Sequence, residues 1–499
     1  MNHTVTQVIR VLVLSFMTIC VCKAEDITIR YKGATAKVTQ KVKDSVDVTV
    51  EGSKVNIESR YTGHKLTLKL MGNSDDGQLN LKTAGKAKVT LDGLMLTSQE
   101  GAPICLKNKK KVEVAVTKGT ENSLTITACN DTANQKAAAI WSKDKLLLSG
   151  KGVLNVLATG DGCRGIKTKK DITIEELTLN VTTSGNNLGE KPFEMGGPGG
   201  PGGPPPFGND SIKPGDFPKP PFGGPPPFGN DSLRRDGPPD FGGEMPDFDG
   251  EMPDFGGGFG GKHKYVASTK GIASKGKITI NSGNVTVRTN TAGAEGIEGK
   301  DGILFNGGNV DVLATDDAIN SNATIEFNGA NVIARSMGND AVDANPEGGF
   351  FPPFGGNNAQ KIEPAIIIRG GTVYAWSQVG PPEEGLDSDM APLAIEDGTI
   401  FTVGGFIGDM PSVPTNETAK QPTVLITGLN IVKDEPIYIT DESGKTLFTV
   451  TIPFSLRGSA TLIANPAFKL GGTYTIKTKG YEKTFILSES FTAFNEKRS

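Results

Sequence analysis

The chain has 499 residues, with 52 Lys and Arg against 56 Asp and Glu, which gives a net charge of −4. Because this mild acidity leaves no excess of basic side chains for phosphate groups, it argues against nucleic acid or an anionic membrane surface as a partner. The three histidines, His3, His64 and His263, are too few for a histidine-rich metal site, and neither a nucleophile elbow nor an HExxH motif occurs.

Residues 1–24 have the layout of a cleaved secretory signal: Arg10, then an apolar stretch over 11–22, then Ala24 before an acidic pair. The apolar stretch is too short to span a bilayer comfortably, and no other segment is apolar enough, so we expect no membrane insertion. The sequence thus predicts an exported protein that is extracellular, attached to the cell surface or periplasmic.

Three cysteines, Cys105, Cys129 and Cys163, follow the predicted signal, and an odd number leaves at least one thiol outside any disulfide. Cys105 and Cys163 lie beside aliphatic residues of the repeat described below, where a cysteine can fill a coil interior as a small apolar side chain. We favour this packing role over a disulfide.

Residues 25–101 are predicted to form the opening coils of a stacked β structure. Period-2 alternation of apolar residues occurs at 46–51, 66–70 and 88–94, which is typical of strands with one buried face. The apolar pattern is less regular in these residues than in the repeat that follows. This is expected at the end of a repeat array, where an atypical coil must cover an open strand edge.

Residues 102–398 contain a recurring phrase: a small residue, an aliphatic residue, two further residues and a polar residue. The aliphatic and polar members are Ile104/Lys107, Ile140/Lys143, Ile166/Lys169, Ile272/Lys275, Ile297/Lys300, Ile319/Asn322 and Val342/Asn345. From Ile272 the spacing is 25, 22 and 23 residues, the size of one coil. Short alternating strands broken by Asn and Gly fill each coil, and no helical periodicity extends beyond ten residues. The repeat therefore predicts an all-β fold, a parallel β-helix.

The repeat is interrupted at 189–261 by a segment of Pro, Gly, Phe and Asp. Such a segment can build neither a strand ladder nor a helix, because proline removes backbone donors and glycine raises the ordering cost. We expect a disordered loop thrown out of one coil, which either covers a binding surface or is a low-complexity spacer. A smaller insert of the same kind occupies 346–358.

Residues 399–499 lack the repeat phrase and read as longer strands joined by turns. The predicted strands are 423–426, 437–440, 446–452, 460–464, 473–477 and 483–487. They form either a C-terminal β cap or a small β-sandwich.

Acidic residues gather in the last regular coils. In a parallel stack, equivalent residues of successive coils lie about 4.8 Å apart, so their carboxylates repel one another unless a cation lies among them. Several carboxylates with neighbouring amide oxygens suit Ca²⁺. The predicted calcium ligands are Glu295, Glu298, Asp301, Asp316, Asp317, Asp340 and Asp343, with Asn320 in the same register. The alternative is a solvated acidic face neutralised by adjacent lysines.

The polar members of the phrase form a second column, whose lysines are Lys107, Lys143, Lys169, Lys275 and Lys300. Ammonium groups along one line repel unless they face acids or an anionic ligand, so Lys143, Lys169, Lys275 and Lys300 are candidates for ligand binding. They are equally interpreted as solvated turn residues. Trp141 could stack on a sugar ring, as could Tyr374 and Trp376, which share a strand face, but packing inside the protein explains all three as well.

Three stretches of the text resemble a bacterial β-helical carbohydrate-binding domain family. They are Ala138-Ala-Ile-Trp-Ser-Lys-Asp, Gly165-Ile-Lys-Thr-Lys-Lys-Asp-Ile-Thr-Ile and Asp316-Asp-Ala-Ile-Asn-Ser, and the resemblance extends over about 26–345. That family is distantly similar to calcium-dependent pectate lyases. The resemblance implies binding of acidic or cellulosic plant polysaccharide with Ca²⁺ along the solenoid, whereas the long Pro/Gly/Phe insert lies outside the family pattern.

The sequence therefore predicts a secreted, right-handed parallel β-helix that binds polysaccharide without catalysis. A polysaccharide lyase acting by β-elimination is the first alternative, and it requires a base such as a lysine with a lowered pKa. A structural, adhesin-like surface protein is the second alternative. The pattern leaves the polysaccharide, the number of calcium ions and the oligomeric state open.

Overall fold

The computed structural model describes residues 26–130, 136–190, 265–346, 363–389, 391–405 and 412–495, all of which belong to one compact unit. Within these ranges every regular element is a strand and no helix occurs, so the predicted all-β class is confirmed. The described residues therefore contain no helix that is long and apolar enough to cross a membrane. The predicted signal, most of the insert at 189–261 and all of the insert at 346–358 after Pro346 lie outside the described residues.

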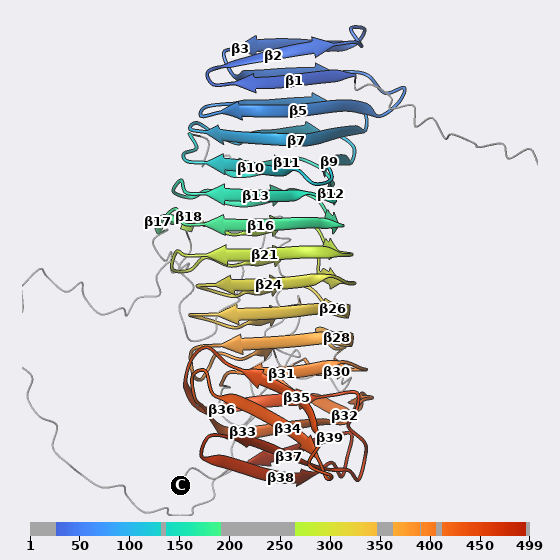
Figure 1. Cartoon of the computed structure of the whole chain (residues 1–499), viewed down its shortest axis with the longest axis vertical. Coiled ribbons are helices and arrows are strands. Elements are labelled where there is room, and N and C mark those ends of the chain that lie inside the picture. Colours follow the sequence, from blue (N-terminus) through green and yellow to red (C-terminus); the bar gives the residue numbers. More distant parts are fainter. Residues whose placement is uncertain are drawn as a thin grey trace, which may run out of the picture. The chain divides into compact units, whose positions relative to one another are not determined.

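The chain winds through coils of three strands, and each strand pairs in parallel with its equivalent in the next coil (Figure 1). One coil consists of β8 (Ile104–Asn108), β9 (Val112–Val116) and β10 (Glu121–Ile126). The next consists of β11 (Ala138–Ser142), β12 (Leu146–Gly150) and β13 (Val153–Ala158), and all three pairs are parallel. The stack therefore has three parallel ladders, named here first, second and third in chain order.

The first ladder is an eleven-stranded sheet. Besides β8 and β11 it contains β4 (Lys54–Ser59), β6 (Gln78–Thr83), β14 (Arg164–Thr168), β19 (Ile272–Ser274), β22 (Ile297–Gly299), β25 (Ile319–Ser321), β27 (Val342–Ala344) and β29 (Leu386–Asp387). It ends at β3 (Val46–Glu51), which is antiparallel to β4.

The second and third ladders join into one 22-stranded sheet because the long strands cross from one ladder to the other. The long strands are β5 (Leu66–Ser74), β7 (Ala87–Ser98), β26 (Ile325–Ser336) and β28 (Ile366–Ser377). The second ladder also contains β15 (Ile172–Glu175), β20 (Ile278–Ile280), β23 (Ile303–Phe305), β30 (Leu393–Ile395) and β32 (Pro414–Ala419). The third contains β16 (Leu177–Thr183), β21 (Gly283–Thr289), β24 (Asn309–Ala314) and β31 (Thr399–Val403). Two short strands on either side of the long insert, β17 (Leu188–Glu190) and β18 (Tyr265–Ala267), pair with each other antiparallel.

The aliphatic members of the repeat phrase form a continuous buried column on the first ladder. Each pairs with its equivalent in the next coil, in the order Ile104, Ile140, Ile166, Ile272, Ile297, Ile319, Val342 and Leu386. All are at most 3% exposed and pack with the inward residues of the other two ladders. The predicted stacking of the repeat is therefore confirmed, and we call this set the aliphatic column.

Buried residues outside the aliphatic column also pack on their equivalents in neighbouring coils. Phe305 and Phe327 stack in adjacent coils with ring centroids 5.0 Å apart and planes at 9°. The equivalent residues of the coils on either side are Ile280 and Ile368, so this interior position is apolar in all four coils and aromatic in two of them.

Cys163 is buried in the coil interior and forms no disulfide, which confirms its predicted packing role. Cys105 is also buried and forms no disulfide, but it packs beside Trp141 on the outward side of the ladder and not in the interior as predicted.

Asparagine side chains form two ladders at the turn between the second and third strands of the coil. Asn306 Nδ2 donates to Asn281 Oδ1 at 2.9 Å and Asn328 Nδ2 donates to Asn306 Oδ1 at 2.9 Å. A parallel set links Asn331, Asn309 and Asn284 at 3.0 and 2.9 Å. The middle amides, Asn306 and Asn309, both donate and accept, so the turns of neighbouring coils are held in register.

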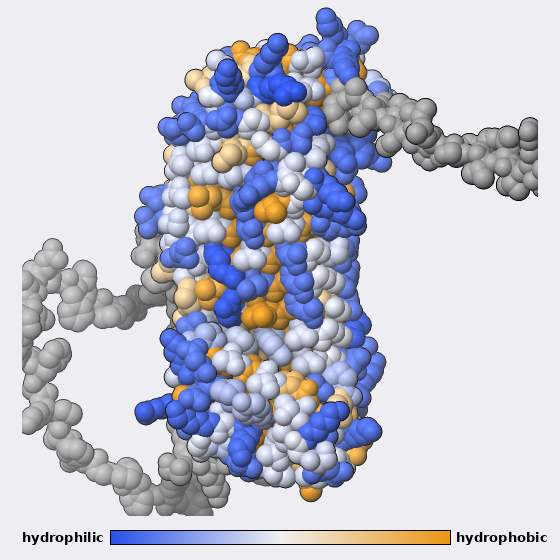
Figure 2. Space-filling view, viewed as in Figure 1, coloured by the Kyte–Doolittle hydropathy of each residue, from blue (hydrophilic) through white to orange (hydrophobic). Residues whose placement is uncertain are grey.

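The outer surface of the third ladder is exposed in the view of Figure 2, where apolar side chains gather between hydrophilic ones along the middle of the face. Outward residues of this ladder include Met95, 61% exposed, and Leu157, 37% exposed.

Antiparallel strands close both ends of the stack. At the beginning, β1 (Ile27–Lys32) pairs in parallel with β5 and antiparallel with β2 (Thr35–Gln40). At the other end, β36 (Leu456–Ala464) is antiparallel to β31 and to β33 (Thr423–Ile431), which also pairs with β39 (Phe491–Asn495). The three period-2 runs predicted at the beginning of the chain fall in β3, β5 and β7.

A separate four-stranded antiparallel sheet consists of β34 (Pro436–Asp441), β35 (Thr446–Thr451), β37 (Thr473–Thr478) and β38 (Tyr481–Ile486). All six strands predicted after residue 399 overlap observed strands. A second buried apolar cluster fills this region and includes Trp376, whose Nε1 donates to Phe401 O at 3.2 Å. Tyr374 stacks on Trp376 with centroids 5.8 Å apart, so both rings pack beneath the C-terminal strands.

We predict that Ile297→Ala will lower the free energy of unfolding by about 2–5 kcal/mol, because it opens a cavity in the fully buried aliphatic column. Urea unfolding followed by circular dichroism measures this loss. Leu304→Ala, in the neighbouring strand with its side chain outward, is the control and should cost less than about 1 kcal/mol. Equal losses in the two variants would contradict the inward assignment of Ile297.

Candidate functional site

The first ladder carries two outward columns beside the aliphatic column. The polar column follows each aliphatic residue by one position and consists of Cys105, Trp141, Lys167, Ala273, Glu298, Asn320, Asp343 and Asp387, which pair in that order. The flanking column precedes each aliphatic residue by two positions and consists of Ala102, Ala138, Arg164, Lys270, Glu295, Asp317, Asp340 and Glu384. Neighbouring coils bring equivalent members within one strand spacing, about 4.8 Å.

The columns begin with an apolar zone. Trp141 packs with Ala102, Cys105 and Ala138 in a small buried cluster and is only 3% exposed. Its ring face is therefore covered by protein in this arrangement, and the sugar-stacking role of Trp141 stays a prediction.

A cationic zone follows, made of Arg164, Lys167 and Lys270, each at most 9% exposed. Arg164 Nη2 donates to Ser268 Oγ at 3.2 Å, and Arg164 Nη1 has no acceptor among the described residues. Burial, reinforced by the charge of Arg164, lowers the pKa of Lys167 to about 7. The lysine with a lowered pKa that the lyase alternative requires therefore occurs in the polar column.

The next coil holds an ion-pair network. Lys270 Nζ lies 2.9 Å from Glu295 Oε2 and 2.7 Å from Glu298 Oε1. Lys300 Nζ lies 2.8 Å from Glu298 Oε1 and 3.0 Å from Asn322 Oδ1. Glu295 and Glu298, two of the predicted calcium ligands, are thus neutralised by lysines, as in the alternative interpretation of the sequence.

Charge and burial compete in this network. Burial acts to raise the pKa of Glu298, but Lys270 and Lys300 outweigh it and lower the pKa to about 2. At Glu295 burial prevails over Lys270 and the pKa is raised. Burial acts to lower the pKa of Lys270, but the two glutamates outweigh it and the pKa is raised. The ammonium group of Lys270 therefore stays charged and serves both carboxylates.

The acidic zone begins one coil further on. Asp317, Asp340 and Asp343 offer carboxylate oxygens that all lie within 4.8 Å of one another, at exposures of 2%, 6% and 3%. Asn320 Nδ2 donates to Asp317 Oδ2 at 2.8 Å and to Asp343 Oδ2 at 3.0 Å. Burial raises the pKa of Asp340 well above its ordinary value, and Asp387, Asp317 and Asp343 raise it further. We call Asp317, Asp340 and Asp343 the aspartate triad.

The sequence interpretation missed two residues of this zone, Glu384 and Asp387. Asp340 Oδ1 accepts a hydrogen bond from Glu384 N, and Asp387 pairs with Asp343 across β29 and β27. Ser412 N donates to Glu384 Oε2 at 2.9 Å and Ser412 Oγ donates to Asp387 Oδ1 at 3.2 Å. The signal was the phrase Glu384-Gly-Leu-Asp, which matches Asp340-Ala-Val-Asp but follows it after a long insertion.

Two other predicted ligands lie apart from the triad. Asp301 is exposed in the turn after β22. Asp316 is half-buried and its Oδ1 accepts a hydrogen bond from Asn339 Nδ2 at 3.0 Å. The structure therefore brings together Asp317, Asp340 and Asp343 of the seven predicted ligands.

The lysine column lies at the edge of the same ladder. Lys107, Lys143, Lys169 and Lys275 are exposed, and no ion pair to any of the four occurs among the described residues. Their backbone amides donate across the coils, as Lys169 N does to Ser142 O at 3.1 Å and Lys275 N to Thr168 O at 3.2 Å. One face thus presents solvated ammonium groups at coil spacing beside a column that becomes acidic further along.

Comparison with known proteins identifies the sequence type of these coils. Residues 51–192 and 259–344 match the family model described as carbohydrate-binding domain-containing protein. A carbohydrate-binding domain-containing protein from Acetivibrio thermocellus is 30% identical over 145 residues, which cover 28% of this chain and 47% of the relative. The chain thus spans about half the length of that relative. The similarity to carbohydrate-binding domains that the repeat phrases suggested is therefore confirmed over these residues.

A solved structure is also similar. It is the gadolinium derivative of a polysaccharide lyase-like protein from C. thermocellum, with 18% sequence identity and a TM-score of 0.40. The match covers 64% of this chain and 92% of that one.

We predict that Lys270→Met will lower the free energy of unfolding at pH 7 by about 3–5 kcal/mol, because Glu295 and Glu298 would stay buried without their shared cation. In the wild type, the lowered pKa of Glu298 stabilises the fold above pH 4.5, and this stabilisation is lost as the pH falls towards 2. The difference between wild type and variant should therefore shrink over that range. Urea unfolding at several pH values measures it.

The control is Lys277→Met, which removes an exposed lysine from the same coil and should change stability by less than about 0.5 kcal/mol. A loss below about 1 kcal/mol for Lys270→Met would contradict the network.

Proposed function

We propose that the chain is an exported, right-handed parallel β-helix that binds an acidic polysaccharide without catalysis and uses Ca²⁺ at the aspartate triad. The supporting observation is the combination, on one ladder, of exposed lysines at coil spacing and a buried set of carboxylates. Export rests on the signal predicted at 1–24, and carbohydrate binding is supported by the family match over the coils.

The lysine column suits a ligand with repeated negative charge. Lys143, Lys169 and Lys275 are separated by single strand spacings of about 4.8 Å and remain solvated, so each can pair with a carboxylate of a polymer lying along the stack. A neutral polymer would leave their mutual repulsion unchanged. A polyuronate is therefore the ligand class that the column favours.

The aspartate triad fits calcium by its chemistry. Its donors are carboxylate oxygens, and hard oxygen ligands are those that Ca²⁺ prefers. Asn320 turns its Nδ2 towards Asp317 and Asp343 and holds these two carboxylates together. The raised pKa of Asp340 reflects the cost of holding several acids together under burial. A bound divalent cation would offset that repulsion, and Asp317, Asp340 and Asp343 would hold it.

A lyase is the second candidate, because the pKa of Lys167 is lowered to about 7, the range of a general base. β-Elimination requires the base and the cation that acidifies the proton to act on one sugar unit. Lys167 lies three strand spacings from Asn320 in the polar column, about 14 Å. That separation favours binding over catalysis.

We expect Ca²⁺ to stabilise the wild type, by about 2.7 kcal/mol at a concentration 100-fold above its dissociation constant. Asp340→Asn should abolish most of this gain, and without calcium it should leave stability unchanged or raised, because it removes a repelled buried charge. Thermal unfolding with calcium or with a chelator measures both effects. Asp301→Asn is the matched control and should respond to calcium like the wild type.

Alanine replacement of Lys143, Lys169 and Lys275 together should weaken retention on polygalacturonate roughly tenfold, since each exposed ion pair contributes about 0.5 kcal/mol. The control removes three exposed lysines from the connections between the C-terminal strands, Lys433, Lys445 and Lys469, and should bind like the wild type. Ultraviolet absorbance of unsaturated product, followed in the same samples, should stay flat. Rising absorbance that Lys167→Ala removes would establish the lyase instead.

A further inference from the structure

Two buried N–H groups on adjacent coils of the first ladder have no hydrogen-bond acceptor among the described residues. They are Nε1 of Trp141 on β11 and Nη1 of Arg164 on β14, and the two residues are 3% and 8% exposed. A buried donor without an acceptor gives up its hydrogen bond to water and gains none in return, so such groups are rare in folded proteins. Both donors therefore point to an acceptor that the described side chains do not supply.

The two donors lie where the flanking column meets the polar column. Trp141 pairs with Lys167 across β11 and β14, one strand spacing away, and Arg164 is the flanking residue of the same coil as Lys167. In a later coil the two columns are in contact, because Asn320 Nδ2 donates to Asp317 Oδ2 at 2.8 Å. The same register places Arg164 beside Lys167. We call Trp141, Arg164 and Lys167 the donor cluster.

The coils on either side of the donor cluster offer no oxygen atom at the equivalent positions. The equivalent residues are Ala138 and Lys270 for Arg164, and Trp141 and Ala273 for Lys167. None of these four side chains carries an oxygen or a negative charge. Arg164 Nη2 donates to Ser268 Oγ at 3.2 Å, which leaves Nη1 for another acceptor.

The buried lysine of the next coil, by contrast, is neutralised by carboxylates of the chain. Glu295 and Glu298 outweigh the burial of Lys270, so its pKa is raised. At Lys167 burial prevails and, with the charge of Arg164, lowers the pKa to about 7 although Glu298 acts to raise it. Burial lowers the pKa of Arg164 as well. The donor cluster thus holds positive charge that the carboxylates further along the ladder do not offset.

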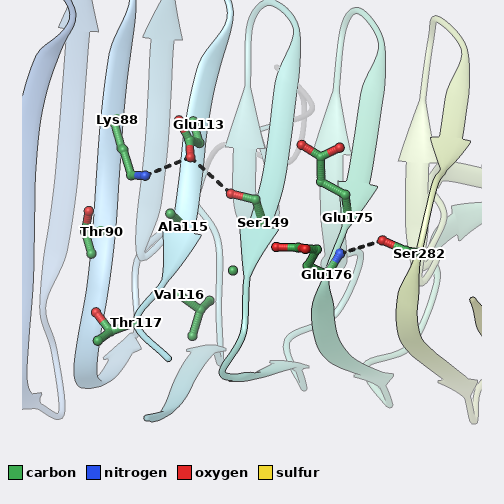
Figure 3. A pocket seen from close by; sticks show the side chains of 11 residues that line it. Lys88, Thr90, Glu113, Ala115, Val116, Thr117, Ser149, Glu175, Glu176 and Ser282 are labelled. Atoms are coloured by element: carbon green, nitrogen blue, oxygen red, sulfur yellow. Dashed lines mark hydrogen bonds and ion pairs between the residues drawn. The ribbon is translucent and has the colours of Figure 1, made fainter. Parts of the chain in front are cut away.

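A partly buried charge on the second ladder shows the more common arrangement (Figure 3). Glu113 Oε1 lies 2.9 Å from Lys88 Nζ and accepts a hydrogen bond from Ser149 Oγ at 3.2 Å. Its other oxygen, Oε2, lies 2.9 Å from Lys65 Nζ. Both oxygens of this carboxylate are therefore partnered within the chain, as is general for buried polar groups.

An oxyanion is the ligand that the donor cluster fits. Indole, guanidinium and ammonium groups donate hydrogen bonds and accept none. A carboxylate supplies two oxygens as acceptors together with the negative charge, and hydrogen bonds between ionised groups are stronger than those between neutral groups. A sugar hydroxyl could accept one of these hydrogen bonds, but it would leave the charge of Arg164 and Lys167 without compensation.

We propose that Trp141, Arg164 and Lys167 form an anion site that binds one carboxylate group of a uronate, separate from the exposed lysine column. Because the three residues are at most 8% exposed, the carboxylate enters by displacing neighbouring side chains and is held out of water, where its attraction to the cations is strongest. Lys169 of the lysine column lies two residues from Lys167, about 7 Å away, so a polymer on that column can place one carboxylate in the site.

This inference rests on the proposed function only in taking a polyuronate as the source of the carboxylate. Its test uses a single uronate unit, galacturonate, titrated calorimetrically into the full-length mature protein at constant ionic strength. Galactose is the uncharged counterpart. The chain has two tryptophans, and Trp376 is buried beneath the C-terminal strands, so a change of tryptophan emission on binding reports on Trp141. Galacturonate should bind and change the emission, whereas galactose and sodium chloride should do neither.

Two variants remove single donors. Lys167→Met should weaken galacturonate binding about tenfold or more, and without ligand its melting temperature should be unchanged or raised, because it removes a buried charge that the chain does not offset. Trp141→Phe keeps an aromatic ring but removes the N–H, so it should weaken binding severalfold and abolish the emission change. Lys170→Met, which removes an exposed lysine from the same coil, is the matched control and should bind like the wild type.

Absence of galacturonate binding to the wild type, equal binding of galactose, or full affinity in both Lys167→Met and Trp141→Phe would overturn the proposal. The variant lacking Lys143, Lys169 and Lys275 should still bind galacturonate, and loss of that binding would assign the single unit to the lysine column and overturn the site. A wild type that binds galacturonate but is not retained on polygalacturonate would contradict the proposed polymer binding and leave the anion site standing.

Discussion

The structure depends on the parallel pairing of equivalent strands at about 4.8 Å, which places equivalent side chains of successive coils in direct contact. For the aliphatic column this repetition is favourable, since each isoleucine packs on the next. For charged positions it is unfavourable, because like charges at that distance repel. The chain resolves the conflict by changing residue type along the columns of the first ladder, from apolar to cationic to ion-paired to acidic. At the acidic end, burial and the neighbouring carboxylates raise the pKa of Asp340 well above its ordinary value.

The aliphatic column could be predicted because its signal is local: one small residue, one aliphatic residue and a regular spacing. The same spacing located Asp317, Asp340 and Asp343. It failed at Glu384 and Asp387, since a long insertion after Asn345 breaks the period and the phrase then carries leucine in place of isoleucine or valine. Recognising them needs the pairing of β29 with β27, which only the folded chain reveals.

The partners of Glu295 and Glu298 were assigned incompletely for a related reason. In sequence, Lys270 belongs to no repeated set, because its equivalents are Arg164 in one coil and Glu295 in the next. Only the stacked geometry shows that its ammonium group reaches both glutamates. Lys167 was not predicted either, because its lowered pKa results from burial, and the burial of a lysine cannot be read from the sequence.

The lysine column has a definite length. It runs from Lys107 to Lys300 over four strand spacings, about 19 Å, and the equivalent positions beyond it are Asn322 and Asn345. A polymer lying on this face therefore meets cations over a fixed number of its units, however long it is. In the proposed binding mode, each added unit of a short oligomer makes one more contact with a lysine. Once the oligomer is as long as the column, further units add only alternative positions in which it can bind. In the same binding mode, selectivity among chain lengths is set by the number of coils that carry a solvated lysine, a series that ends at Lys275 because Lys300 pairs with Glu298.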